Sequence, residues 1–359
     1  MKKLFLLLLI TQTAFAQNLK PGFDKNEYTE FLRITVEQFD SVYQSKFEKP
    51  KQYQMVYRSK VIGMDNRWEL WWNEQDKVAL ISLRGTTLET ISWIENFYAA
   101  MVPATGIMKL NDSTSFSYKL AENDRAAVHV GWLTGMAYIA TDLMPHLDSC
   151  IQKGVTQFIV SGHSQGGALT FLLTSHLRYL QKQQRIPAAV QFKSYCSAAP
   201  KPGNLYYAYD YETITQGGWS YTVVNTSDWV PETPISIQTA DDFNPTNPFV
   251  NAKDGISKQK FPNNLVMKYV YNSLDKPTKE ARDTYQKYLG KEVSKIVQKH
   301  LVGYSPPTFY NSNNYMRVGP FIILNPDAEY AIKFPEDPKQ IFRHHLMAPY
   351  LYLIDKWKE

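Results

Sequence analysis

The stretch Ile159-Val160-Ser161-Gly162-His163-Ser164-Gln165-Gly166-Gly167-Ala168 decides the fold, because an apolar run passes into a helical pattern around a Gly-x-Ser-x-Gly pentapeptide. The apolar run is of the kind that fills a parallel sheet, and helical periodicity follows it. A strand that reverses directly into a helix holds Ser164 in a strained conformation and leaves no room for side chains at Gly162 and Gly166. We therefore predict an exposed serine nucleophile; the alternative is a glycine-rich turn with an inert serine.

Other segments predict the elements around this turn. Strands are expected at 68–72, 78–83, 192–199 and 221–225, the first two as a hairpin, and a helix is expected at 131–147. Strands that alternate with helices predict an α/β fold with a mostly parallel central sheet flanked by helices. Residues 17–60 are expected to form an N-terminal helical segment that packs on the sheet of a main domain at 61–359. Within it, 235–335 is polar and without clear strand alternation, which predicts a largely helical insertion.

The N-terminus has the pattern of a bacterial secretory signal peptide over residues 1–16. A basic start is followed by the apolar run 4–10 and by Ala14-Phe15-Ala16, which resembles a cleavage site. The apolar run is too short to span a bilayer, and no later segment approaches the required length. We therefore expect a secreted or periplasmic protein without a transmembrane segment.

Charge and cysteine content exclude several other classes of protein. The formal net charge is +5, and it falls to +3 when Lys2 and Lys3 are removed with the signal peptide, which is too mild to indicate nucleic acid as a partner. Two cysteines do not make a disulfide scaffold. Cys196 lies in an apolar run and is expected as a buried thiol, although pairing with Cys150 stays open. No cofactor and no metal are expected.

A helical run is expected after Pro277, with lysines that recur at every fourth position. The four are Lys287, Lys291, Lys295 and Lys299. Such a ladder is typical of a solvated helix face, and contact with an anionic surface is the alternative.

A serine nucleophile needs a histidine base and an acid that holds it, and after an elbow of this kind the acid precedes the histidine. Asp228 follows the strand expected at 221–225, at the sheet edge where active sites of open α/β folds collect, so we predict it as the acid. The alternative is an aspartate that caps a turn. His176 is about three helical turns past Ser164 and cannot return to it. His300, His344 and His345 remain as bases.

The sequence resembles the class 3 lipases of the fungal triacylglycerol lipase type. The resemblance rests on residues 81–87 (ISLRGTT), 92–94 (SWI), 128–131 (VHVG), 162–167 (GHSQGG), 225–231 (NTSDWVP) and on His345 with the segment after it. It covers about 65–235 and the last twenty residues. It implies the α/β-hydrolase fold and a lid that begins at Trp93-Ile94.

Carried over to this sequence, the resemblance implies Ser164 as nucleophile, Asp228 as acid and His345 as base. It also implies an oxyanion hole formed by the backbone N–H of Gln165 and by Thr86. The residues themselves favour Thr86 for this role, because it ends an apolar strand beside the nucleophile strand. Only one of His344 and His345 can face Ser164, and the spacing to the apolar C-terminal segment favours His345. His129 and His163 are expected to be structural.

Three departures leave the substrate open: Gln165 replaces the usual Leu, Trp132 replaces a Phe, and an insertion of about a hundred residues separates acid and base. The leading hypothesis is a secreted serine hydrolase that cleaves carboxylic esters, a lipase acting on acylglycerols with transient contact to a lipid surface. An esterase for short or aromatic (feruloyl-type) acyl groups and an inactive hydrolase-like binding protein are the alternatives. Apolar residues in 88–128 predict a mobile lid.

Overall fold

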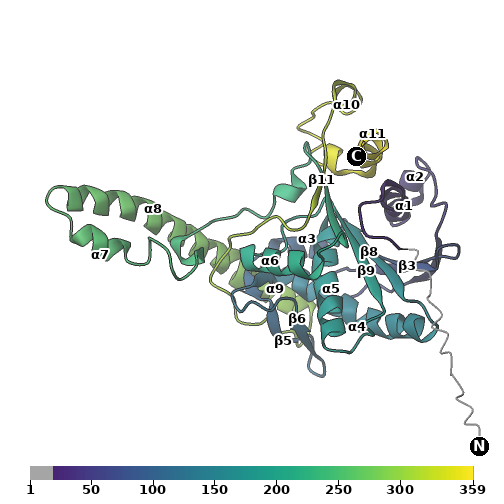
Figure 1. The fold of residues 1–359 in the computed structure, drawn as a ribbon, viewed down its shortest axis with the longest axis horizontal. Helices are drawn as coiled ribbons and strands as arrows, with labels where there is room; N and C mark the ends of the chain where they lie inside the picture. Colours follow the sequence, from purple (N-terminus) through teal and green to yellow (C-terminus); the bar gives the residue numbers. More distant parts are fainter. Residues whose placement is uncertain (1–18, 359) are drawn as a thin grey trace, which may run out of the picture.

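The computed structural model describes residues 19–358, so the expected signal peptide lies outside the described residues. Seven strands form the central sheet in the order β1-β2-β3-β8-β9-β10-β11 (Figure 1). They are β1 (Gln54–Arg58), β2 (Trp68–Asn73), β3 (Val78–Leu83), β8 (Gln157–His163), β9 (Gln191–Ser197), β10 (Ser220–Asn225) and β11 (Phe321–Leu324). From β3 to β11 all neighbouring strands are parallel, whereas β1, β2 and β3 pair antiparallel. The predicted hairpin and the mostly parallel α/β sheet are therefore confirmed.

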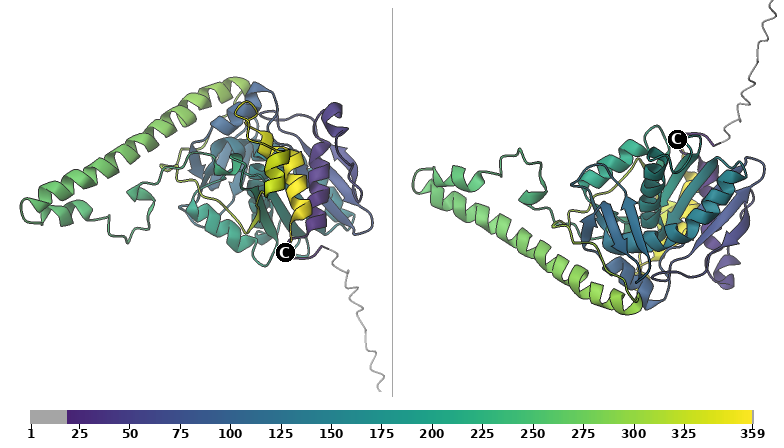
Figure 2. Two further views of the ribbon diagram at one scale, coloured as in Figure 1. Left: turned by 90° about the horizontal axis from the view of Figure 1, so that it is seen from above. Right: turned by 90° about the horizontal axis from the view of Figure 1, so that it is seen from below.

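Helices cover both faces of this sheet. Along the chain they are α1 (Lys25–Val36), α2 (Ser41–Gln44), α3 (Thr90–Phe97), α4 (Val130–Gln152), α5 (Gln165–Lys182), α6 (Leu205–Ile214), α7 (Ala252–Ser257), α8 (Asn263–Gln286), α9 (Val293–His300), α10 (Ala328–Lys333) and α11 (Met347–Lys356). Side chains of α4, α5 and α6 form one hydrophobic core with the sheet, and those of α1 and α11 form another on the opposite face. The result is a three-layer arrangement in which α1 and α11 lie side by side (Figures 1 and 2).

Strand β3 shows how the sequence produces these layers. Successive side chains of a strand point to opposite faces, and Ile81 joins the core beneath α4 and α5 while Leu80 joins the core beneath α1 and α11. All six residues of β3 are buried, because helices cover both faces. Residues 17–60 supply α1 and α2, and also the edge strand β1.

The structure corrects the sequence analysis inside the polar region 235–335. This region holds β11, which pairs in parallel with β10 and extends the central sheet, although no strand was predicted there. The helical run expected after Pro277 begins earlier, at Asn263, so that Pro277 lies inside α8. A short π-helical segment, Lys287–Glu292, then links α8 to α9.

The outer part of this region projects from the body of the molecule. In all three views α7 and α8 extend away from the sheet as a long arm, with the turn between them at its tip (Figures 1 and 2). Its base is fixed by an ion pair between Arg282 and Asp241, with 2.8 Å between Nη1 and Oδ2. We refer to residues 249–281 as the arm.

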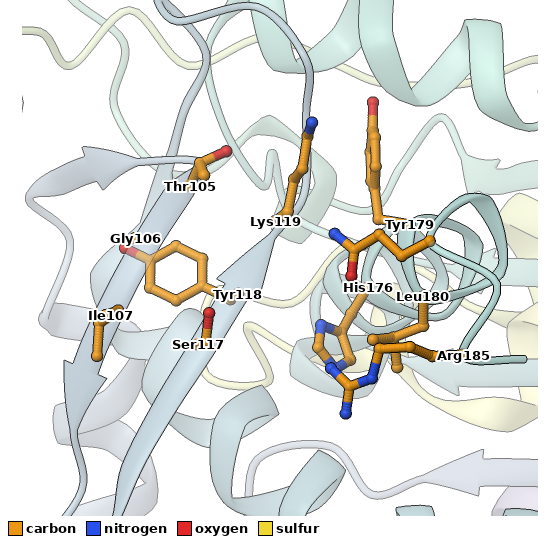
Figure 3. Close-up of a pocket in the computed structure, with 11 residues that line it drawn as sticks. Thr105, Gly106, Ile107, Ser117, Tyr118, Lys119, His176, Tyr179, Leu180 and Arg185 are labelled. Atoms are coloured by element: carbon orange, nitrogen blue, oxygen red, sulfur yellow. The ribbon is translucent and has the colours of Figure 1, made fainter.

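Four further strands form two small sheets beside α4 and α5. Strand β4 (Met101–Pro103) pairs with β7 (Ala127–His129), and β5 (Thr105–Lys109) pairs with β6 (Ser115–Lys119). A cavity of about 320 Å³ lies between β5, β6 and the C-terminal part of α5, where His176 lines it (Figure 3). This cavity is at the opposite end of α5 from Ser164.

Neither cysteine is paired. Cys196 is fully buried on β9, as expected, and Cys150 is half-buried near the end of α4. Across residues 19–358, none of the helices combines the length and apolar character that crossing a bilayer would require.

Candidate active site

Ser164 stands at the turn between β8 and α5 in a backbone conformation that L-residues rarely adopt. Its φ is 63° and its ψ is −131°, and it is the residue immediately before α5. The chain is locked there by hydrogen bonds at both sides: Ser164 N–H donates to the carbonyl of Ser197 (2.9 Å), and Gly167 N–H donates to the carbonyl of Ser164 (2.9 Å). Such strain persists only where surrounding contacts impose it. The sequence prediction of a strand-turn-helix elbow is confirmed.

The flanking glycines make this tight turn possible. A Cβ atom at Gly162 would lie 2.1 Å from the carbonyl oxygen of Gly166, and one at Gly166 would lie 2.3 Å from the carbonyl oxygen of Leu83. Both distances are far below van der Waals contact, so no larger residue fits. The two glycines let α5 pack directly against β8 and β3, which sets Ser164 at the carboxyl edge of the sheet.

The residues predicted as acid and base are in direct contact. His345 Nδ1 lies 2.7 Å from Asp228 Oδ2, although 117 positions separate them in the sequence. The same carboxylate oxygen accepts a hydrogen bond from Tyr350 Oη (2.8 Å), and Oδ1 accepts one from Val230 N–H (3.0 Å). Asp228 is 3% exposed and His345 is 7% exposed. The imidazole is thus fixed by a buried, fully hydrogen-bonded carboxylate.

These contacts keep Asp228 ionised. Burial alone would raise the pKa of its carboxyl group, but the attraction of His345 and the hydrogen bonds from His345, Val230 and Tyr350 outweigh burial and hold the pKa below its ordinary value. An ionised Asp228 places the His345 proton on Nδ1 and leaves Nε2 unprotonated in the neutral ring. This is the tautomer that a general base requires.

His163 joins the base to the elbow. Its Nε2 donates to the backbone carbonyl of His345 (2.7 Å), and its Nδ1 lies 2.9 Å from Ser197 Oγ, which in turn lies 2.6 Å from Tyr28 Oη. Burial, with the nearby His345, lowers the pKa of His163 to about 3, so the ring is neutral. Because His163 directly precedes Ser164, this bond brings the loop of His345 beside the nucleophile. His163 is therefore a structural residue, and its hydrogen bond positions the loop that carries His345.

Two backbone N–H groups beside Ser164 are free to bind an anion. Gln165 is the first residue of α5, where an N–H has no partner within the helix, and in the described chain neither its N–H nor that of Thr86 meets an acceptor. The Thr86 hydroxyl is oriented by Asn96, whose Nδ2 donates to it at 2.9 Å. Asn96 is held in turn by Trp132 Nε1 (2.9 Å) and by His129 Nε2 (3.1 Å). Gln165 thus directly follows Ser164, and Thr86 follows Gly85, at which a Cβ would lie 3.4 Å from the Cβ of Ser164.

His129 belongs to the framework of this loop. It stacks on Trp132 with 3.6 Å between ring centroids and accepts a hydrogen bond from the backbone of Trp132 at the start of α4. Burial lowers the pKa of His129 to about 3, which keeps the ring neutral. These contacts agree with the structural role expected for it.

The family resemblance predicts a leucine at position 165, and the contacts of Gln165 explain why a polar side chain stands there. Gln165 is buried, and its Oε1 accepts a hydrogen bond from Ser92 Oγ at 3.3 Å. Ser92 Oγ also accepts from the N–H of Thr87 (3.1 Å), the residue after Thr86. A polar side chain at 165 therefore couples the start of α5 to α3 and to the Thr86 loop.

Glu95 lies at the centre of this polar layer and is fully buried. Its Oε2 accepts a hydrogen bond from Asn66 Nδ2 (2.7 Å), and no cation neutralises it. The residue fits because α4 has a glycine opposite it: a Cβ at Gly135 would lie 2.2 Å from Glu95 Oε1. Burial raises the pKa of Glu95 to about 8, since the hydrogen bond from Asn66 compensates only in part. Glu95 is therefore protonated at neutral pH.

Aromatic rings surround the outer side of the site. The ring of Phe342 lies 6.0 Å from that of His345, 5.8 Å from that of Trp93 on α3 and 5.3 Å from that of Trp229. Large apolar side chains on the neighbouring loops are exposed, with Leu88 at 99% and Ile341 at 60%. The entrance to the site is therefore apolar.

The other histidines considered as bases lie elsewhere. His344 Nδ1 lies 2.7 Å from Tyr330 Oη, and the His344 carbonyl accepts from Asn225 Nδ2 (3.0 Å). His300 is exposed at the end of α9, and His176 lines the remote cavity. Of these candidates, only His345 contacts Asp228.

Three residues of the site were not found by the sequence analysis: Tyr350, Asn96 and Glu95. Tyr350 and Asn96 act through contacts that form only in the folded chain. Glu95 and Asn96 directly follow the Trp93-Ile94 pair, and these polar residues between Ile94 and Phe97 were the available signal.

An elbow serine, a histidine–aspartate pair and two free N–H groups at the carboxyl edge of a mostly parallel sheet define the arrangement of an α/β-hydrolase. Residues 80–238 match the family model for class 3 lipases. The resemblance seen in the sequence is thereby confirmed.

Solved structures of fungal lipases are also similar to the chain. The triacylglyceride lipase of Rhizomucor miehei is 18% identical, with 60% of this chain and 77% of that chain covered and a TM-score of 0.43. The Lip2 lipase of Yarrowia lipolytica is 17% identical, with coverage of 60% and 78% and a TM-score of 0.43. A fungal lipase–inhibitor complex is 18% identical, with coverage of 58% and 74% and a TM-score of 0.44. A search of curated proteins gives no match.

Proposed function

We propose that the protein is a serine hydrolase that cleaves carboxylic esters, with Ser164 as nucleophile, His345 as base and Asp228 as acid. The observation that carries the proposal is the strained elbow of Ser164 next to a buried His345–Asp228 pair, linked to it through His163. A buried carboxylate with this hydrogen bond to an imidazole is the standard way to fix a general base.

The reaction follows from these groups. Ser164 Oγ attacks the ester carbonyl carbon while His345 Nε2 takes the hydroxyl proton, and the negative oxygen that forms binds to the N–H groups of Gln165 and Thr86 and to the Thr86 hydroxyl. His345 gives its proton to the leaving alcohol, which departs and leaves an acyl-serine. Water, deprotonated by His345, then attacks the acyl-serine, and the carboxylic acid is released with Ser164 restored.

A fluorophosphonate probe tests this proposal. The probe should label the folded protein at Ser164, as located by peptide mass spectrometry, and the Ser164→Ala variant should not be labelled. Failure of the folded protein to react would favour the alternative of an inactive hydrolase-like binding protein.

The apolar entrance supports a lipase over an esterase for short acyl groups. Phe342, Trp93 and Trp229 would contact an acyl chain that enters toward His345. Hydrolysis of p-nitrophenyl esters of increasing chain length, measured below and above substrate solubility, should then favour long chains. A preference for short or feruloyl esters would identify the protein as an esterase.

We also propose that residues 88–128 contain a mobile lid, as the sequence predicts. This segment exposes large apolar side chains beside the site, with Leu88 at 99% and Phe97 at 53%. Activity is expected to rise sharply when a substrate passes from monomer to emulsion. Smooth saturation through that point would contradict a closing lid.

Export is the remaining part of the proposal. Cleavage after Ala16 would give a mature protein that starts at Gln17. N-terminal sequencing of protein recovered outside the cytoplasm tests this, and an intact Met1 there would contradict it.

A further inference from the structure

The arm exposes a larger set of apolar side chains than a solvated helix would. Phe261 is 78% exposed, Tyr269 is 75% exposed and Leu274 is 68% exposed, and six more large apolar residues of the arm are at least 44% exposed. The six are Phe249, Val250, Leu265, Val266, Met267 and Val270. Contiguous exposed apolar surface of this kind marks a site of interaction.

The distribution of these residues around α8 distinguishes a lipid surface from a partner helix. At 100° per residue, Leu265, Val266, Met267, Tyr269, Val270 and Leu274 occupy an arc of about 200°, and the opposite side carries Asn264, Lys268, Asn272 and Asp275. A helix that pairs with another helix needs only a narrow apolar seam. An arc this wide suits a helix that lies in the plane of a lipid surface with its lysines at the polar boundary.

The charge of the arm points in the same direction. Between Phe249 and Leu274 there are four lysines and one aspartate, which gives a formal charge of 4 − 1 = +3. The lysines are Lys253, Lys258, Lys260 and Lys268. All four are exposed, and within the described residues none of them forms an ion pair with a carboxylate. Free lysines among exposed apolar residues complement an anionic lipid surface.

The lysine ladder of the sequence analysis does not offer this combination. On α9, Val293 and Val297 are buried against the body of the protein, and Lys295 pairs with Glu292 at 2.7 Å. Of the large apolar residues along the ladder, Tyr288 (53% exposed) and Ile296 (47% exposed) remain exposed, a smaller set than on the arm. Within residues 19–358, the arm is the element that combines a large set of exposed apolar side chains with unpaired lysines. It also projects from the body of the molecule (Figure 2).

We propose that the arm is a docking element for an anionic lipid surface. Its apolar residues insert among the acyl chains, its lysines contact the anionic headgroups, and Tyr269 and Tyr271 lie at the boundary between the two. The base of α8 leads through the π-helical segment to α9, which packs against α3, so docking by the arm holds the body of the enzyme next to the surface. The arm takes no part in the chemistry.

Flotation with vesicles tests the proposal. The full chain carrying Ser164→Ala serves as the parent, because it leaves the lipids intact whether or not the proposed hydrolase activity is correct. Vesicles of phosphatidylglycerol and phosphatidylcholine in equal parts are compared with vesicles of phosphatidylcholine alone. All variants share residues 1–18, so any binding by that segment is common to them.

Two variants change the arm, and a third is the matched control. The apolar variant is Leu265→Ser with Val266→Ser and Tyr269→Ser, and the charge variant is Lys253→Gln with Lys258→Gln and Lys260→Gln. The control replaces the equally exposed Val42, Val61 and Ile332 by Ser. We expect the parent and the control to bind the anionic vesicles alike. Each arm variant should bind them at least about tenfold more weakly than the parent does. Binding of the parent should fall as salt rises.

Three results would overturn the proposal. They are a parent that does not bind the anionic vesicles, an apolar variant that binds them as the parent does, and equal binding to both kinds of vesicle. Sedimentation velocity adds a fourth: a dimer that the apolar variant converts to a monomer would show that the arm binds a second copy of the chain instead.

Discussion

The candidate active site and the arm differ in how far their side chains are buried. At the site, Asp228 and His345 are almost completely buried, and each oxygen of the carboxylate has a hydrogen-bond partner. On the arm, apolar residues such as Phe261 and Tyr269 are about three-quarters exposed, and no other part of residues 19–358 covers them. Interactions within the chain determine the geometry of the site, whereas the arm offers its surface to something outside the chain. Substitutions in the two regions should therefore have different consequences.

The largest expected effect is at the elbow. Ser164→Ala should lower ester turnover by a factor on the order of a million, because the members of a catalytic triad act as a unit. The fold should stay intact, since the hydrogen bonds that hold residue 164 come from its backbone. Steady-state kinetics on one soluble ester, with circular dichroism as the check of folding, measures both. Residual activity within tenfold of wild type would end the serine-hydrolase interpretation.

The adjacent histidines provide a test within one loop. His345→Ala should lower turnover by several orders of magnitude, because it removes the ring that contacts Asp228. His344→Ala is the matched control and should cost about tenfold or less, since its ring contacts Tyr330 and not the carboxylate. Kinetics of both variants on the same ester decides the assignment, and the reverse ranking would transfer the role of base to His344.

The sequence predicted the site far better than it predicted the arm, and the reason is the range of the interactions. The elbow leaves a pattern within five consecutive residues, because the turn requires Gly162 and Gly166 for steric reasons, even though the atom that a Cβ at Gly166 would meet belongs to Leu83. Asp228 followed from its place after a strand. The hydrogen bond from Tyr350 to Asp228, in contrast, spans 122 positions and leaves no local pattern.

The insertion was less predictable because its elements are short or lack a partner. Strand β11 has four residues, and its identity as a strand depends on pairing with β10 about a hundred positions earlier. Helix α8 has apolar residues on more than half of its circumference and so lacks the narrow stripe that marks a surface helix packed on a core. The proline inside it also suggested a helix start where the structure has helix interior.

The third prediction is that the buried carboxyl group of Glu95 lowers the free energy of unfolding at high pH. Its pKa, about 8 against an ordinary 4.5, means that the folded protein keeps a proton that the unfolded chain loses between these values. Stability should therefore fall as pH rises from about 4.5 to about 8. Glu95→Gln removes this dependence and keeps the acceptor for Asn66, so it should stabilise the protein by up to a few kcal/mol at pH 8, at roughly 1.4 kcal/mol per pKa unit.

Denaturant unfolding of wild type and Glu95→Gln across pH 4 to 9 measures this dependence. The gain should shrink toward zero below about pH 4.5, where the carboxyl is protonated in both states. Glu89→Gln, at an exposed carboxylate directly before α3 that forms no ion pair within the described residues, is the control and should follow the wild-type curve. Parallel curves for wild type and Glu95→Gln would show that Glu95 is ionised in the fold.

The smallest expected effect is that of the arm variant on stability and on activity toward a soluble ester. A small effect is the result that supports an arm independent of the site. The variant Leu265→Ser with Val266→Ser and Tyr269→Ser changes three side chains that are at least 56% exposed, so it removes almost no buried contact. Its free energy of unfolding should stay within about 0.5 kcal/mol of wild type per substitution. Its kcat/KM on a short soluble ester should also be unchanged within about twofold, because a monomeric substrate reaches Ser164 without any surface. Urea unfolding and kinetics on that ester measure the two quantities. A strong loss of either would show that the arm packs against the body in solution, and the contrast between a self-contained site and an outward-facing arm would then fail.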